Sequence, residues 1–172
     1  VFTSGKNFAM VMARTLGVEL NFLSHQENHI FSALVDKNME NYGEFNAIHI
    51  SGGTTEILEV NRNSSSLDIR EIGKTLDLSF GQLVDRIGIK LGFTFPCGKE
   101  MDQFIKDTVC NPDTLDFSLP LKQAVKDTDF NISGIENKLI SFYEDHSSEK
   151  FIKEFIVYHL FTYLGELLLK II

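Results

Sequence analysis

The stretch GKTLDLSFGQLVDRIGIKL, residues 73–91, marks the change from strands to helices along this sequence. From Ser79 onward its apolar residues follow the spacing of one helical face: Phe80, Leu83, Val84, Ile87 and Leu91. Gly92 then provides a suitable stop, because glycine readily adopts the left-handed conformation that ends a helix. The spacing predicts an amphipathic helix over 79–91 with its apolar face in a core.

Strands are predicted before this helix and further helices after it. The segments 45–51, 56–60 and 67–72 form a plausible antiparallel meander, joined by a glycine turn and by the polar loop 61–66. Periodicity and breakers predict the other elements: helices over 6–16, 25–35, 99–106, 131–143 and 149–171, a strand over 18–23, a connection over 37–44 and a loop over 110–121. Strands followed by helices indicate an α/β or α+β fold.

Composition excludes several classes of protein. The chain has 172 residues, 43% of them hydrophobic, which argues against a disordered or fibrous state. The apolar end, 167–172, is too short to span a bilayer, so no membrane is expected. A net charge of -8 is unfavourable for holding a nucleic acid without a partner. Cys97 and Cys110 form no disulfide framework, which predicts a reduced, cytoplasmic setting.

His25 and His29 lie four residues apart in the segment HQENH. On a helix this spacing puts both imidazoles on one face, close enough to bind one metal ion. Two ligands do not complete a metal site, and the sequence shows no obvious cluster that supplies the others. Two histidines on a polar helical face are the alternative interpretation.

Glycines and carboxylates recur together in patterns that suit a nucleotide. In SGGTT, residues 51–55, successive N–H groups after a strand can cradle a phosphate, although a plain hairpin turn is the alternative. Gly81 and Asp85 are one helical turn apart, which puts a carboxylate beside a glycine surface and suits a ribose diol. Gly98 and Asp102 repeat this spacing. A solvated carboxylate and an ordinary helix start are the respective alternatives.

The order and spacing of these motifs resemble the TsaD family, the tRNA threonylcarbamoyladenosine transferases once called O-sialoglycoprotein endopeptidases or glycoproteases. Family members carry motifs like HxEGH, SGGHT, GxTxDDAxGEAFDK, LGLxYPGGP and FSFSGLKT. The corresponding segments here are HQENH at 25–29, SGGTT at 51–55, GKTLDLSFGQLVDR at 73–86, LGFTFPCG at 91–98 and FNISGIE at 130–136. The resemblance extends from about Phe8 over nearly the whole chain.

The resemblance implies a fold and a reaction. The fold is actin/Hsp70/sugar-kinase-like (ASKHA, ribonuclease H-like), with 1–42 as a remnant of the amino-terminal lobe and 43–172 as the second lobe. The reaction transfers a threonylcarbamoyl group from threonylcarbamoyl-AMP, an ATP-derived adenylate, to N6 of the tRNA adenosine beside the anticodon. The implied ligand contacts are Ser51, Gly52 and Gly53 for the phosphates, Asp85, Gly98 and Asp102 for the ribose and adenine, and His25 and His29 for iron or zinc.

Several residues depart from the family motifs: Asn28, Thr54, Leu78, Gln82, Cys97 and Glu136. Gln82 and Glu136 change the charge of motif positions, and Cys97 replaces a glycine, which reduces backbone freedom. The family's amino-terminal acidic loop, its later Gly-Gly-Val loop and its final metal-binding Asp are also not found. We therefore expect this chain, a fragment or a divergent paralogue, to be inactive alone.

Two alternative functions are consistent with these departures. One is a non-catalytic paralogue that acts as a dimerisation partner in the tRNA-modifying complex. The other is a sugar or acetate kinase of the same superfamily. The pair His25 and His29 argues against a kinase, because kinases of this fold do not need it.

Overall fold

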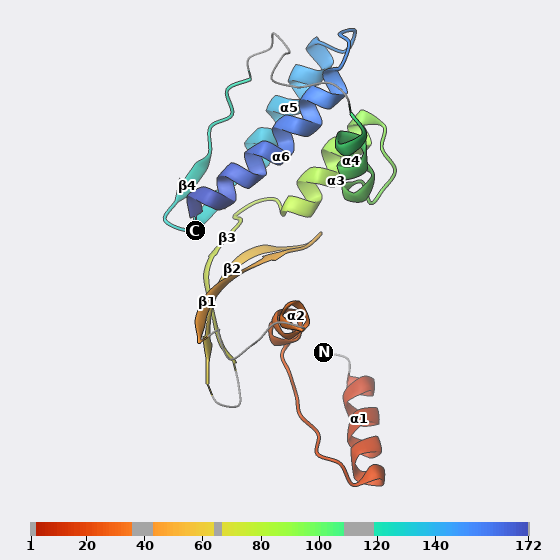
Figure 1. The fold of residues 1–172 in the computed structure, drawn as a ribbon, viewed down its shortest axis with the longest axis vertical. Coiled ribbons are helices and arrows are strands. Elements are labelled where there is room, and N and C mark those ends of the chain that lie inside the picture. The colour runs from red at the N-terminus through yellow and green to blue at the C-terminus, as the bar shows by residue number, and fades with distance from the viewer. Residues whose placement is uncertain (1–2, 36–42, 64–66, 109–118, 172) are drawn as a thin grey trace. The chain divides into compact units, whose positions relative to one another are not determined.

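The computed structural model describes residues 3–35, 43–63, 67–108 and 119–171 (Figure 1). The chain divides into two compact units. Unit 1 comprises Val1–Gly43 and Asn61–Ile69, and unit 2 comprises Glu44–Val60 and Arg70–Ile172. The described residues combine helices with small β-sheets, which confirms the predicted class, a mixed α and β fold.

The helices of unit 1 are α1 (Thr3–Leu16) and α2 (His25–Leu34), close to the predicted bounds. A capping box begins α2. The Ser24 Oγ accepts the Glu27 N–H at 3.1 Å, and the Ser24 N–H donates to Glu27 Oε2 at 2.6 Å. Local sequence therefore determines where the helix carrying both motif histidines begins.

The predicted strand over 18–23 is wrong, because this segment has no regular secondary structure. The side chains of Val18, Phe22 and Leu23 are all more than half exposed. A strand needs a hydrogen-bonded neighbour and a face to bury. Among the described residues, the segment has no strand partner, and its apolar composition alone does not make it a strand.

The larger sheet contains β1 (Glu44–Ile50), β2 (Thr55–Arg62) and β3 (Leu67–Lys74), in the order β1-β2-β3. The short connection between β1 and β2 suits antiparallel neighbours, since parallel strands need a long crossover. All three predicted strands are confirmed. Most of the predicted connection 37–44 and of the predicted loop 110–121 lies outside the described residues, as does the end of the loop 61–66.

The core of unit 2 is built around α3 (Phe80–Leu91), which contacts α4 (Gly98–Asp107), α5 (Ser133–Asp145) and α6 (Ile152–Ile171) (Figure 1). The predicted apolar face of α3 is buried. It packs with fully buried side chains of the later segments, among them Phe130, Leu139, Phe155, Leu160 and Leu167. None of the described helices combines the length and the apolar character needed to cross a membrane.

A small hairpin, β4 (Ala124–Lys126) and β5 (Asp129–Asn131), was not predicted. Strands this short carry too few residues for a periodic pattern. Because β5 includes Asn131, α5 begins at Ser133 rather than at the predicted Asn131.

The hairpin attaches to the end of β3. Thr75 and Phe130 form a parallel bridge, and the Leu76 N–H donates to the Phe130 carbonyl at 2.8 Å. A Cβ on Gly73 would lie 2.4 Å from the Thr128 carbonyl oxygen, so only glycine allows this approach. The segment GKTLD, 73–77, is thus a structural junction.

Candidate functional site

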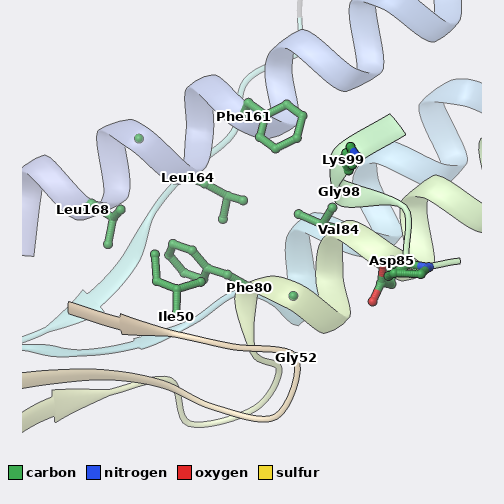
Figure 2. Close-up of a pocket in the computed structure, with 13 residues that line it drawn as sticks. Ile50, Gly52, Phe80, Val84, Asp85, Gly98, Lys99, Phe161, Leu164 and Leu168 are labelled. Carbon is green, nitrogen blue, oxygen red and sulfur yellow. The ribbon is translucent and has the colours of Figure 1, made fainter. Parts of the chain in front are cut away.

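A cavity of about 600 Å³ opens in unit 2 between the β1–β2 turn, α3, the start of α4 and α6 (Figure 2). This volume is within the range of small-molecule pockets. Most lining residues are apolar, and the charged ones are Asp85 and Lys99. The full lining is Ile50, Gly52, Phe80, Gly81, Val84, Asp85, Pro96, Gly98, Lys99, Phe161, Leu164, Gly165 and Leu168.

The β1–β2 turn is held by its own first side chain. Ser51 Oγ accepts the N–H groups of Gly53 at 3.1 Å and Thr54 at 2.9 Å. The Ser51 N–H in turn donates to the Thr54 carbonyl at 2.9 Å. A phosphate bound at this turn would have to compete with Ser51 Oγ for two of the amides.

The start of α3 is fastened to this turn. Ser79 Oγ donates to the Gly52 carbonyl at 2.9 Å, and the Phe80 N–H donates to Thr55 Oγ1 at 2.9 Å. A Cβ on Gly81 would lie 2.7 Å from both the Gly52 Cα and the Ser51 carbonyl oxygen. Gly81 is therefore required for the close approach of the two backbones.

Gln82, one of the departures from the family motifs, completes a capping box. Its N–H donates to Ser79 Oγ at 3.1 Å, and its Oε1 accepts the Ser79 N–H at 3.2 Å. A neutral amide can accept this hydrogen bond in place of a carboxylate. The residue thus has a structural function at the start of α3.

Asp85 connects α3 to the start of α4. Its Oδ1 accepts the Cys97 N–H at 2.7 Å. Cys97 is fully buried and adopts φ -76° and ψ -23°, a right-handed helical conformation open to any residue. The replacement of glycine by cysteine therefore imposes no backbone strain here.

The Cys97 side chain occupies space that Gly88 leaves open. A Cβ on Gly88 would lie 2.3 Å from Cys97 Cβ and 2.7 Å from its Sγ. Burial, followed by the nearby carboxylates of Asp85 and Glu100, raises the pKa of the Cys97 thiol. The residue is a packed, protonated thiol rather than a nucleophile.

Three of the six predicted nucleotide residues line the cavity: Gly52, Asp85 and Gly98. Ser51 and Gly53 flank Gly52 in the turn. Asp102 does not line the cavity and instead bonds Lys106 Nζ through Oδ2 at 2.6 Å. The cavity thus brings together residues from β1–β2, α3 and α4 that lie far apart in the sequence.

Other lining residues were missed by sequence reasoning. Phe161, Leu164 and Leu168 come from α6, which is apolar around most of its circumference, so spacing did not distinguish one face. Lys99 lies beside the predicted Gly98, and a charge next to a site glycine was the only available signal.

The other charge-changing departure, Glu136, lies at the start of α5. Its Oε2 accepts a hydrogen bond from Arg86 of α3 at 3.1 Å, and its side chain is largely buried. A negative charge at this position therefore has a cationic partner within the fold.

Asp77 links the segment before α3 to the start of α5. Its Oδ1 accepts the N–H groups of Leu78 at 2.7 Å and Ile132 at 3.0 Å, and its Oδ2 accepts the Ser133 N–H at 3.0 Å. Burial acts to raise the pKa of Asp77, but these hydrogen bonds outweigh it and lower the pKa from 3.8 to about 2.

We expect Asp77→Asn to reduce stability mainly above pH 4. The lowered pKa of Asp77 means that its ionised form stabilises the fold fully above 3.8, and that this contribution is lost as pH falls towards 2. The free energy of unfolding should fall by on the order of 1 kcal/mol and no more, because solvent screens this exposed carboxylate. Urea unfolding of both proteins between pH 2.5 and 7 measures it, and a stability difference that widens at low pH would contradict the assignment.

The motif histidines of α2 lie together. His29 Nε2 and His25 Nε2 are 3.0 Å apart, and the rings meet edge to face. Two imidazole nitrogens at this separation fit two positions around one ion. Within the described ranges, no group of three or more His, Cys, Asp or Glu side chains could hold a metal. The pair therefore fits part of a metal site.

The chain matches the TsaD family, described as tRNA N6-adenosine threonylcarbamoyltransferase, over residues 3–160. Curated relatives that carry this name include proteins from three bacteria. The one from Chlorobium luteolum is 30% identical over 87% of this chain, that from Chlorobium limicola 31% over 84%, and that from Malacoplasma penetrans 34% over 80%. The alignments cover 44%, 42% and 41% of those relatives, so the chain spans less than half their length.

Proposed function

Because this chain belongs to the TsaD family of tRNA N6-adenosine threonylcarbamoyltransferases, we propose that its cavity binds an adenine nucleotide. The nucleotide is AMP, ATP or the adenylate part of threonylcarbamoyl-AMP. One observation supports this most strongly: Gly52, Asp85 and Gly98, from three separate motifs, line a single cavity.

Asp85 is proposed to bind the ribose. The Cys97 N–H occupies its Oδ1 at 2.7 Å and thereby restrains the carboxylate. An ionised carboxylate still has further acceptor positions for the two hydroxyl donors of a diol. The apolar side chains of Phe80, Val84 and Leu164 provide walls against which a purine can pack.

The remaining predicted contacts are retained as proposals. Ser51 and Gly53 belong to the turn whose Gly52 reaches the cavity, and close approach of a ligand there is helped by the small size of Gly52, where an added Cβ would have nothing within 4 Å. Asp102 would contribute from α4 only after leaving Lys106 Nζ.

His25 and His29 are proposed to hold one iron or zinc ion as two of its ligands. When bound, such an ion would act as a Lewis acid that polarises a carbonyl. The chain's own contribution is to keep both imidazoles on one face of α2, with the capping box at Ser24 securing the start of that helix.

Threonylcarbamoyl transfer to tRNA is proposed for the whole parent protein, since the chain spans less than half the length of its relatives. We further propose that residues 1–42 and 43–172 are parts of two lobes of an ASKHA-type fold. With a net charge of -8, the chain suits tRNA binding only with help from other parts of the parent or from a protein partner, including a paralogue.

Asp85→Asn tests the nucleotide site. We expect the Kd for AMP, measured by calorimetry on this chain, to rise by about ten-fold, because hydrogen bonds to a charged group contribute about 1.5–3 kcal/mol. The asparagine retains an oxygen for the Cys97 N–H, so the fold is preserved.

Asp107→Asn is the matched control, since Asp107 lies at the far end of α4 and bonds Gln103 rather than lining the cavity. An unchanged AMP affinity in Asp85→Asn, or an equal loss in both variants, would overturn the assignment of Asp85.

A further inference from the structure

Gly165 lies in the interior of α6 and lines the cavity, and nothing in its surroundings requires a glycine. Its backbone is helical with no positive φ, so any residue can adopt this conformation. An added Cβ would meet no atom within 4 Å among the described residues outside its own stretch of helix. A glycine inside a helix lowers the stability of that helix relative to alanine. Gly165 therefore weakens α6 without a compensating contact in this part of the chain.

The other helical glycines at the cavity differ from Gly165. A Cβ on Gly81 would lie 2.7 Å from the Gly52 Cα, so contact with the β1–β2 turn requires a glycine there. Gly98 is the first residue of α4, where a Cβ would make an ordinary contact with Val84 at 3.8 Å. Among these residues, Gly165 is the one that combines a position deep inside a helix with open space at its Cβ position.

The side chains around Gly165 border a bare patch of α6. Phe161, four residues earlier, and Leu168, three residues later, lie on the same face of the helix, and Leu164 precedes the glycine. All three line the cavity and are apolar. Figure 2 shows Leu164 and Leu168 extending from α6 towards Phe80. The helix therefore forms an apolar wall of the cavity with a gap in its middle.

We propose that Gly165 is a specificity-determining residue that makes room for the purine base of the nucleotide against α6. This inference rests on the nucleotide function proposed above. The β1–β2 turn is assigned to the phosphates and Asp85 to the ribose, which leaves the flat base for the apolar wall. Packing the base there removes apolar surface from water. Because residue 165 has no side chain, the ring can approach the backbone of α6 closely.

Gly165→Ala and Gly165→Leu test the proposal by calorimetry with AMP and adenosine on the full 172-residue chain. We expect the Kd of both ligands to rise by the same factor, about ten-fold for alanine and more than about 100-fold for leucine. Both ligands carry the base, and a larger side chain fills more of its space. Urea unfolding should show both variants at least as stable as the unmodified chain, since alanine and leucine favour helix over glycine.

Gly134→Ala is the control, because it adds a methyl group to α5, outside the cavity, and should leave both Kd values unchanged. Unchanged affinity in either Gly165 variant would overturn the inference, as would a loss confined to AMP, which would put the phosphate at α6. Lower stability of Gly165→Ala would give the glycine a structural role and overturn it as well. These results leave the nucleotide site standing, whereas failure of the unmodified chain to bind either ligand would overturn the proposed function itself.

Discussion

Gly81→Ala is expected to destabilise unit 2 by about 2–3 kcal/mol and to abolish measurable AMP binding. The new Cβ would lie 2.7 Å from the Gly52 Cα and the Ser51 carbonyl oxygen, both of them backbone atoms that cannot rotate away. The turn and α3 must separate, which strains the bonds from Ser79 Oγ and the Phe80 N–H. Overpacking of this kind costs about 1–3 kcal/mol, and the weakened hydrogen bonds add to it.

Urea unfolding of unit 2 and calorimetry with AMP measure the two effects. Gly134→Ala is the matched control, because it lies in α5 and a Cβ there meets nothing within 4 Å. That substitution should be neutral or stabilising, since alanine favours helix by up to about 1 kcal/mol over glycine. The contact argument fails if Gly81→Ala is as stable as Gly134→Ala.

Gly88→Ala is expected to destabilise the contact between α3 and α4 by about 2–3 kcal/mol. Its Cβ would lie 2.3 Å from Cys97 Cβ, and Cys97 is fully buried and cannot yield without moving the start of α4. That movement would also lengthen the bond from the Cys97 N–H to Asp85 Oδ1. The affinity for AMP should fall together with stability.

Cys97→Gly is expected to rescue Gly88→Ala. Removal of the cysteine side chain frees the space that the new Cβ needs, and the remaining close atom, Met101 Sδ at 2.8 Å, ends a flexible part of a side chain. A double-mutant cycle from urea unfolding should show a favourable coupling of more than about 1 kcal/mol. Additive effects of the two substitutions would show that residues 88 and 97 do not share this space.

Some residues of the candidate site could be predicted from the sequence, and others could not. Asp85 and Gly98 were predicted from short Gly-to-Asp spacings within single helices, and both line the cavity. Asp102 shares the same spacing but bonds Lys106 instead, because spacing determines the face of a helix and not what that face meets. Lys99 belongs to no spacing pattern, and its only signal was its place beside Gly98.

The residues that depart from the family motifs also show that a local sequence pattern does not reveal contacts between elements. Cys97 was expected to reduce backbone freedom, yet its conformation is ordinary and its side chain is accommodated by Gly88. Glu136 reverses a charge, yet Arg86 lies 3.1 Å away. In each case the residue that accommodates the change lies on a different element, so a local sequence pattern cannot predict the contact.

Local sequence by itself determined the elements of this protein: the buried face of α3, the caps at Ser24 and Ser79, and the histidine pair on α2. These features depend on contacts between residues only a few positions apart. The regular geometry of a helix determines which of those residues are neighbours. Tertiary structure alone decided that residues 18–23 form no strand, that a hairpin extends β3, and that α6 completes the cavity. Those outcomes depend on partners distant in sequence, whose positions follow only from packing of the whole unit.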